Sequence, residues 1–205
     1  MSVDWDDLPL AAAEAVLSVL ADQVHRDWQV RAGDTDWTCR EMLDHLVHGV
    51  TGYAGLLIVR PVDRYIGLRA GIHPQADVPE AIEAVQIAAA LLATTIRVTS
   101  PDVQAFHPWG TSDRTGFAAM GATELLVHGH DLTRSLGLDW MPPDDLAAQT
   151  LARLFPEAPT AHPPSATLLW STGRLGLPGF PRLTNWQWNG RPQPSLVTGA
   201  EFASA

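Results

Sequence analysis

Two residue types that many enzymes depend on are absent or nearly absent from this sequence. All 13 basic residues among its 205 are arginines, so there is no lysine to form a Schiff base, serve a P-loop or act as a general base. The single cysteine, Cys39, excludes an intramolecular disulfide and a cysteine-based zinc site. A lone thiol suits reducing surroundings.

Positive charge and long uncharged apolar runs are also lacking. The formal net charge is −10 and the isoelectric point is about 5.1, so the overall field repels phosphate backbones and anionic lipids. The first residues are acidic where a signal peptide is basic, and no run of about 18 uncharged apolar residues occurs. We therefore expect a cytoplasmic monomer or homodimer that binds a small molecule and neither nucleic acid nor a membrane.

The remaining composition, with 46% hydrophobic and 18% charged residues, is that of a folded domain. Apolar residues recur at helical spacing in several segments. This spacing predicts helices from Asp6 to about Val30, from Cys39 to about Val59, from Val78 to about Val98, from about Thr115 to Leu136, and from Pro143 to Phe155. Residues 60–76, with two prolines and two glycines, form a long connection.

The expected helix ends carry recognisable signals. Thr38 and Glu41 have the spacing of a capping box, Asp77 and Glu80 form a second cap, and Gly137 is a natural helix terminator. Beyond Pro156 the sequence is rich in Pro, Gly and Trp. We expect there a short helix over 166–172, a small strand or extended segment over 186–188, and a tail from about residue 195. The prediction is an all-α protein: a four-helix bundle with a fifth short helix over 1–155, and a small irregular C-terminal extension over 156–205 packed on it.

The fourth predicted helix carries two polar residues in its apolar stripe. Glu124 and His128 are four residues apart, so they project from one face, a single turn apart. An ionised carboxylate in an apolar stripe costs several kcal/mol unless it is paired, protonated or bound to a metal. The pair fits two ligands of one ion, and it also fits a solvated pair or a simple Glu–His salt bridge.

The second predicted helix offers a third ligand. On its helical wheel His45 faces a packed surface, whereas His48 shares a side with Arg40 and Asp44 and leans toward water. A histidine on an apolar face is often a satisfied core residue, but His45 has company in Glu124 and His128. Two imidazoles and one carboxylate leave open positions on a zinc, iron or nickel ion, as in catalytic sites.

Other residues near these ligands are candidates for catalysis. Asp131, one turn beyond His128, is placed to bond its free ring nitrogen and fix the tautomer, or is simply solvated. His107 and Trp109 precede the helix and are candidates for a lid or a substrate contact, or for ordinary loop packing. Cys39 lacks a nearby base and is not expected to act as a nucleophile.

Two segments together resemble a known family. Trp37-Thr-Cys-Arg-Glu-Met-Leu-Asp-His45-Leu-Val and Ala122-Thr-Glu124-Leu-Leu-Val-His128-Gly-His-Asp131-Leu, followed by Gly137, are similar to the N-terminal domain of the mycothiol-dependent maleylpyruvate isomerase family, within the DinB/YfiT-like superfamily. The resemblance covers about residues 5–140.

This resemblance implies a DinB-like bundle with a metal, often zinc, bound by His45, Glu124 and His128. It also implies a low-molecular-weight thiol cofactor such as mycothiol, and isomerisation or S-transfer on a small electrophile. The chain departs from the family after the fifth helix, where only about fifty residues remain. The stretch Thr172-Gly-Arg174-Leu-Gly-Leu-Pro looks similar to part of the family's C-terminal domain, so Arg174 is a candidate for binding a substrate carboxylate, or is a surface arginine in a turn.

Three functions therefore stay open. The first is a metal-dependent, thiol-using transferase or isomerase. The second is a hydrolase in which the metal activates water, with Asp131 or His107 as proton carrier. The third is a non-catalytic metal-binding or interaction protein with the same bundle, since a fold does not fix a reaction.

Overall fold

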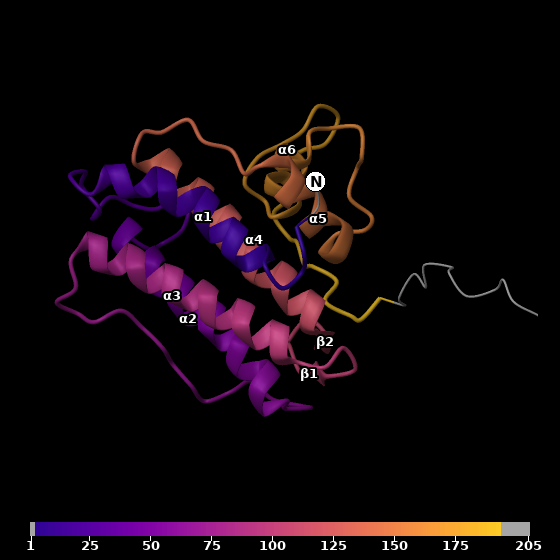
Figure 1. Cartoon of the computed structure of the whole chain (residues 1–205). Coiled ribbons are helices and arrows are strands. Elements are labelled where there is room, and N and C mark those ends of the chain that lie inside the picture. The colour runs from indigo at the N-terminus through magenta and orange to yellow at the C-terminus, as the bar shows by residue number, and fades with distance from the viewer. Residues whose placement is uncertain (1–2, 194–205) are drawn as a thin grey trace, which may run out of the picture.

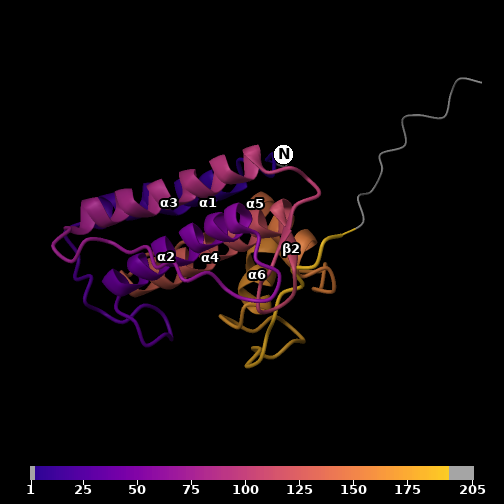
Figure 2. The same cartoon turned by 90° about the horizontal axis from the view of Figure 1, so that it is seen from below.

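Four long helices form the body of the protein. A computed structural model describes residues 3–193, and its long helices are α1 (Leu8–Leu20), α2 (Cys39–Val59), α3 (Val78–Val98) and α4 (Arg114–Ser135). Helices α1 and α2 each pack against both α3 and α4, as Figures 1 and 2 show from two directions. The predicted all-α four-helix bundle is confirmed.

The helix starts follow the local signals in the sequence. In both predicted capping boxes the side chains and backbone amides bond reciprocally, Thr38 with Glu41 before α2 and Asp77 with Glu80 before α3. After the C-cap of α4, Leu136, Gly137 adopts a left-handed φ of 79°. There the amide of Leu138 reaches back to the carbonyl of Thr133, which closes the last turn.

The first helix is shorter than the sequence predicts. It ends at Leu20 and continues only as a 3-10 turn, η1 (Ala21–Gln23), whereas the prediction extended it to Val30. The side chain of Trp28 is buried and its indole donates to the carbonyl of Gln23, and its own carbonyl accepts from the amide of Arg40. The chain therefore turns back to pair with the start of α2 instead of continuing the helix.

The chain after α4 packs against the bundle. Helix α5 (Asp144–Leu154) packs on α4, and α6 (Pro164–Ser171) packs on α5, close to the two short helices predicted. The loop between α3 and α4 contains an unpredicted two-residue pairing of β1 (Gln104–Ala105) with β2 (Ser112–Asp113).

The aromatic segment near the C-terminus is not a strand. Residues 186–188 have irregular structure, and the following amide, of Asn189, donates to the carbonyl of Leu154 at the end of α5. Trp188 is buried by packing on other aromatic rings, so side-chain burial fixes the segment without a partner strand. The tail predicted from residue 195 lies outside the described residues.

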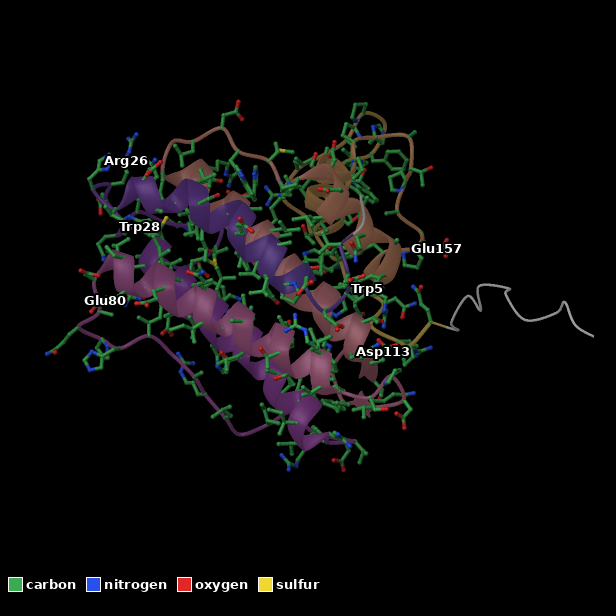
Figure 3. All side chains as sticks on the ribbon, viewed as in Figure 1. Trp5, Arg26, Trp28, Glu80, Asp113 and Glu157 are labelled. Carbon is green, nitrogen blue, oxygen red and sulfur yellow. The ribbon has the colours of Figure 1, made fainter. Side chains whose placement is uncertain are left out.

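Side chains fill the space between the helices (Figure 3), and the core includes Leu43, Leu46, Phe117 and Leu125. Helices α2 and α3 are each long and apolar enough to cross a membrane by length and composition alone. Both pack within the bundle, where 61% of the most apolar 18-residue window of α2 and 39% of that of α3 are buried. Their composition is therefore compatible with core helices of a soluble protein.

Candidate metal centre

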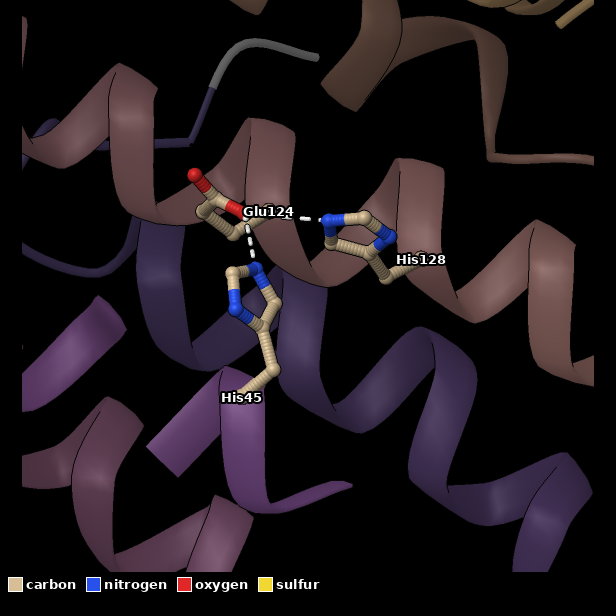
Figure 4. A group of neighbouring side chains, drawn as sticks. All are labelled: His45, Glu124 and His128. Atoms are coloured by element: carbon tan, nitrogen blue, oxygen red, sulfur yellow. Dashed lines mark ion pairs between the residues drawn. The ribbon is translucent and has the colours of Figure 1, made fainter. Parts of the chain in front are cut away.

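Three side chains from two helices meet at one point, as Figure 4 shows. One carboxylate oxygen of Glu124, Oε2, lies 3.2 Å from Nε2 of His128 and 3.4 Å from Nε2 of His45. The two imidazole rings are nearly perpendicular, with centroids 4.9 Å apart. Helix α4 supplies Glu124 and His128 from successive turns, and α2 supplies His45.

The chemistry of the donor set fits a divalent cation. These three residues could hold a metal ion, since each offers a ligand atom and all of these atoms lie within 4.8 Å of one another. In a tetrahedral zinc site with bonds of ~2.0–2.1 Å, ligand atoms are roughly 3.3 Å apart. Both measured nitrogen-to-oxygen distances agree with that spacing. Three protein ligands leave at least one position open for water or a substrate.

Tyr53, two turns beyond His45 on α2, fixes the carboxylate. Its hydroxyl donates a 2.9 Å hydrogen bond to Oε1 of Glu124, the oxygen that does not face the imidazoles. Burial and the nearby charge of Glu124 raise the pKa of Tyr53 well above its ordinary value, so the hydroxyl stays protonated and remains a donor. Tyr53 therefore holds Glu124 in the rotamer that points Oε2 toward the two histidines.

We expect Tyr53→Phe to lower zinc affinity by about 10–100-fold, the usual effect of losing a hydrogen bond that orients a ligand. Competition with a chromogenic chelator measures the change. Tyr65→Phe is the control, because the charge of Glu124 also raises the pKa of Tyr65, but in the part of the chain that the structure describes its hydroxyl makes no hydrogen bond to that carboxylate. Equal zinc affinity in the wild type and Tyr53→Phe would show that the carboxylate needs no such support.

The other ring nitrogen of His128 is also held. Its Nδ1 lies 3.1 Å from Oδ2 of the buried Asp131, and Arg174 donates to the same oxygen at 2.9 Å. This is the hydrogen bond expected from the sequence, and it leaves Nε2 of His128 directed at Glu124. Arg174, predicted as a substrate contact, is instead bonded to Asp131, and whether it also contacts a substrate stays a prediction.

Opposing influences set the protonation of this cluster. Burial would raise the pKa of Glu124, but hydrogen bonds and charge from His128 and His45 outweigh it and hold that pKa well below the usual range. For His128, burial lowers the pKa, but its bonds to Asp131 and Glu124 prevail and raise it. Glu124 is therefore ionised at neutral pH, which suits cation binding, whereas a metal ion bound to His128 would have to displace the proton that the raised pKa favours.

A cavity of about 470 Å³ opens beside the three residues. His45, Glu124 and His128 line it, together with Arg174 and tryptophans from three separate segments: Trp37, Trp109, Trp186 and Trp188. Trp37 stacks on the ring of His45 at 4.3 Å. The volume falls within the ~300–1,000 Å³ of small-molecule sites.

His107 lies behind this cavity and is not among the residues that line it. Its buried ring packs against Tyr53 and Trp188, and its Nδ1 accepts from the backbone amide of Trp109. Burial lowers its pKa to about 4, so it is neutral at pH 7. The structure therefore gives the ring a packing contact, and its predicted catalytic role stays a prediction.

Two further histidines lie near the cluster but outside it. The Nδ1 of His130 bonds to the carbonyl of Trp140, in agreement with its exclusion as a ligand. His48, expected to lean toward water, is half-buried in a neighbouring hollow with Asp44 and Arg69. These two residues provide matched controls for His128 and His45.

Cys39 is buried at the start of α2. Burial, with the charges of Asp27 and Asp131, raises its pKa to about 11, which agrees with the expectation that it is not a nucleophile. We expect native protein at pH 7 to react with a thiol reagent such as dithionitrobenzoate only slowly, and to react at once after unfolding in guanidinium. Rapid labelling of the folded protein would contradict this assignment.

Sequence reasoning missed several residues of the site. Tyr53 follows His45 and Gly49 at helical spacing on the same stripe of α2, so its position was readable from the wheel. Trp37, Trp186 and Trp188 gave no such signal, because irregular segments bring them to the cavity.

No family model, no curated protein and no solved structure matches the chain.

Proposed function

We propose that the protein is a metal-dependent enzyme that uses a low-molecular-weight thiol of the mycothiol type in S-transfer or isomerisation of a small electrophile. The observation that carries the proposal is the convergence of His45, Glu124 and His128 at the base of an open cavity. We infer the thiol cofactor from the similarity of the two sequence segments to the mycothiol-dependent isomerase family. The lone cysteine agrees with a reducing, cytoplasmic location.

When bound, a zinc, nickel or iron ion supplies Lewis acidity that lowers the pKa of a thiol or a water. The protein's own residues do the rest. Tyr53 orients Glu124, and Asp131 orients His128. Arg174 neutralises the negative charge of Asp131. The tryptophans around the cavity exclude water from a bound substrate.

The alternatives find less support. Hydrolysis needs a free proton carrier, but Asp131 is paired with Arg174 and His107 does not line the cavity. A purely structural metal site is closed by protein ligands, whereas this cluster has three donors and a cavity beside it.

The test is a calorimetric titration of mycothiol into zinc-loaded and metal-free protein, followed by an assay of thiol transfer to monochlorobimane. We expect mycothiol to bind only the zinc-loaded form, and His45→Ala to abolish that binding while His48→Ala retains it. Equal binding to both forms, or an activity indifferent to added thiol, would overturn the proposal.

A further inference from the structure

Three indole rings that line the cavity come from outside the four long helices and contact one another. Trp109 lies between β1 and β2, and Trp186 and Trp188 come from the C-terminal extension, yet the three pack as one cluster. The ring centroids of Trp109 and Trp188 are 4.5 Å apart, and those of Trp109 and Trp186 are 5.5 Å apart, both edge to face. Such contacts are favourable and hold the rings rigidly.

The charged groups at the cavity beyond the metal cluster are already paired. Arg174 bonds to Asp131 at 2.9 Å, and Asp36 bonds to Arg31 at 2.8 Å. A substrate carboxylate would have to compete with the buried Asp131 for Arg174, at a cost in desolvation and lost pairing. The described residues that line the cavity therefore offer an anionic group no unpaired arginine, and such a group would be drawn to the bound metal ion and not to the indole rings.

A cationic ligand is also disfavoured. Tryptophan faces attract cations, but two neutral imidazoles and one carboxylate leave a divalent ion with a net positive charge close by. What remains compatible with the tryptophan wall is an uncharged, flat ring, because an aromatic group stacks on indole faces and edges with a preference beyond simple area burial.

We propose that the substrate carries an uncharged aromatic or conjugated ring, which packs on Trp109, Trp186 and Trp188 while its reactive group lies at His45, Glu124 and His128. The inference rests on the proposed function, since it takes the metal cluster as the reactive end of the cavity. It deepens that function by naming the substrate class and by giving Trp186 and Trp188 of the C-terminal extension a part in recognising it. Trp37, 40% exposed and stacked on His45, adds an aromatic surface on the α2 side.

Hydroxamates test this inference, because they bind zinc through one common group and vary only in the attached carbon skeleton. Acetohydroxamate, benzohydroxamate and cyclohexanecarbohydroxamate are titrated into zinc-loaded protein by calorimetry. We expect benzohydroxamate to bind about three- to tenfold more tightly than its saturated analogue, the usual advantage of aromatic pairing. The comparison in the wild type needs no mutation.

Three tryptophan variants then test which residues give the preference for the aromatic hydroxamate. Trp186→Leu and Trp109→Leu should bring the affinity ratio of the two cyclic probes close to one. Trp170→Leu should keep it, since Trp170 lies in the same extension but its indole bonds to the carbonyl of Pro181, away from the cavity. Equal affinities in the wild type, or a ratio unchanged in both cavity variants, would overturn the inference and leave the proposed function standing. Failure of the protein to bind zinc or acetohydroxamate would overturn both.

Discussion

Zinc affinity is expected to fall by more than about 100-fold in Glu124→Gln, beyond the loss that follows when only a supporting hydrogen bond is removed. One oxygen of the Glu124 carboxylate lies close to ring nitrogens of both His45 and His128, and Glu124 supplies the only negative charge of the three donors. A glutamine keeps the size of the side chain but not its charge. The variant therefore isolates the electrostatic contribution of this ligand.

Thermal unfolding with and without zinc provides an independent measure. For the wild type, zinc at a thousand times its Kd should add about 4 kcal/mol to the free energy of unfolding. That corresponds to a rise in Tm of roughly 8–16 °C for a chain of this size. In Glu124→Gln the same zinc concentration should leave Tm nearly unchanged.

His48→Ala and His130→Ala are the matched controls for this experiment. Each removes an imidazole from the same helix as a ligand, but His48 lies in a neighbouring hollow and His130 bonds to Trp140. Both should retain wild-type zinc affinity. Loss of binding in these variants, or retained binding in Glu124→Gln, would mean that the metal is held elsewhere.

The free energy of unfolding is expected to fall by about 3–5 kcal/mol in Asp113→Asn, because the substitution leaves a buried arginine without its partner. The guanidinium of Arg153 is 4% exposed and bonds to Asp113 at 3.0 Å, and it also donates to the carbonyls of Asn189 and Gly190. Asp113 lies at the start of α4 (Figure 3), where it also caps that helix. The pair thus joins α4, α5 and the C-terminal extension.

Urea unfolding at pH 7 measures this loss. Asparagine is a good N-cap, so Asp113→Asn separates the charge from the capping role. Asp7→Asn is the control: its partner Arg97 is also bonded at 2.7 Å, but both side chains are about half exposed, and the expected loss is at most about 1 kcal/mol. If the two variants lost similar amounts of unfolding free energy, the burial of Arg153 would not be what makes its ion pair stabilising.

The loss of stability in Asp113→Asn is expected to depend on pH. Burial would raise the pKa of Asp113, but hydrogen bonds from Gly116, Thr115 and Arg153 outweigh it and hold the pKa below the ordinary 3.8. A carboxyl with a depressed folded-state pKa stabilises the fold above its unfolded pKa and loses that contribution as pH falls through the folded value. The difference in stability between the wild type and Asp113→Asn should therefore be constant near neutrality and shrink below pH 3.8.

Local signals were sufficient to predict the bundle from the sequence. Capping boxes at Thr38 and Asp77 fixed the starts of α2 and α3, and the wheel positions of Glu124, His128 and His45 placed three donors on inward faces. Each of these signals acts within one or two helical turns, where backbone geometry alone determines direction.

Features that depend on contacts distant in sequence were not predictable. The early end of α1 follows from pairing of the chain around Trp28 with the start of α2, which periodicity does not encode. The pairing of Arg174 with Asp131 and the seating of Trp186 at the cavity depend on how the extension folds back. The part of the cavity lining that Arg174, Trp186 and Trp188 supply lies in this irregular segment, where hydrophobic periodicity carries little information.

Anomalous diffraction at the zinc edge, from crystals of protein purified without chelator and supplied with zinc, tests the central claim most directly. We predict one anomalous peak per chain, about 2.0–2.1 Å from Nε2 of His45, Nε2 of His128 and a carboxylate oxygen of Glu124. A peak elsewhere, or none at this cluster at saturating zinc, would contradict the assignment of these three residues as a metal site.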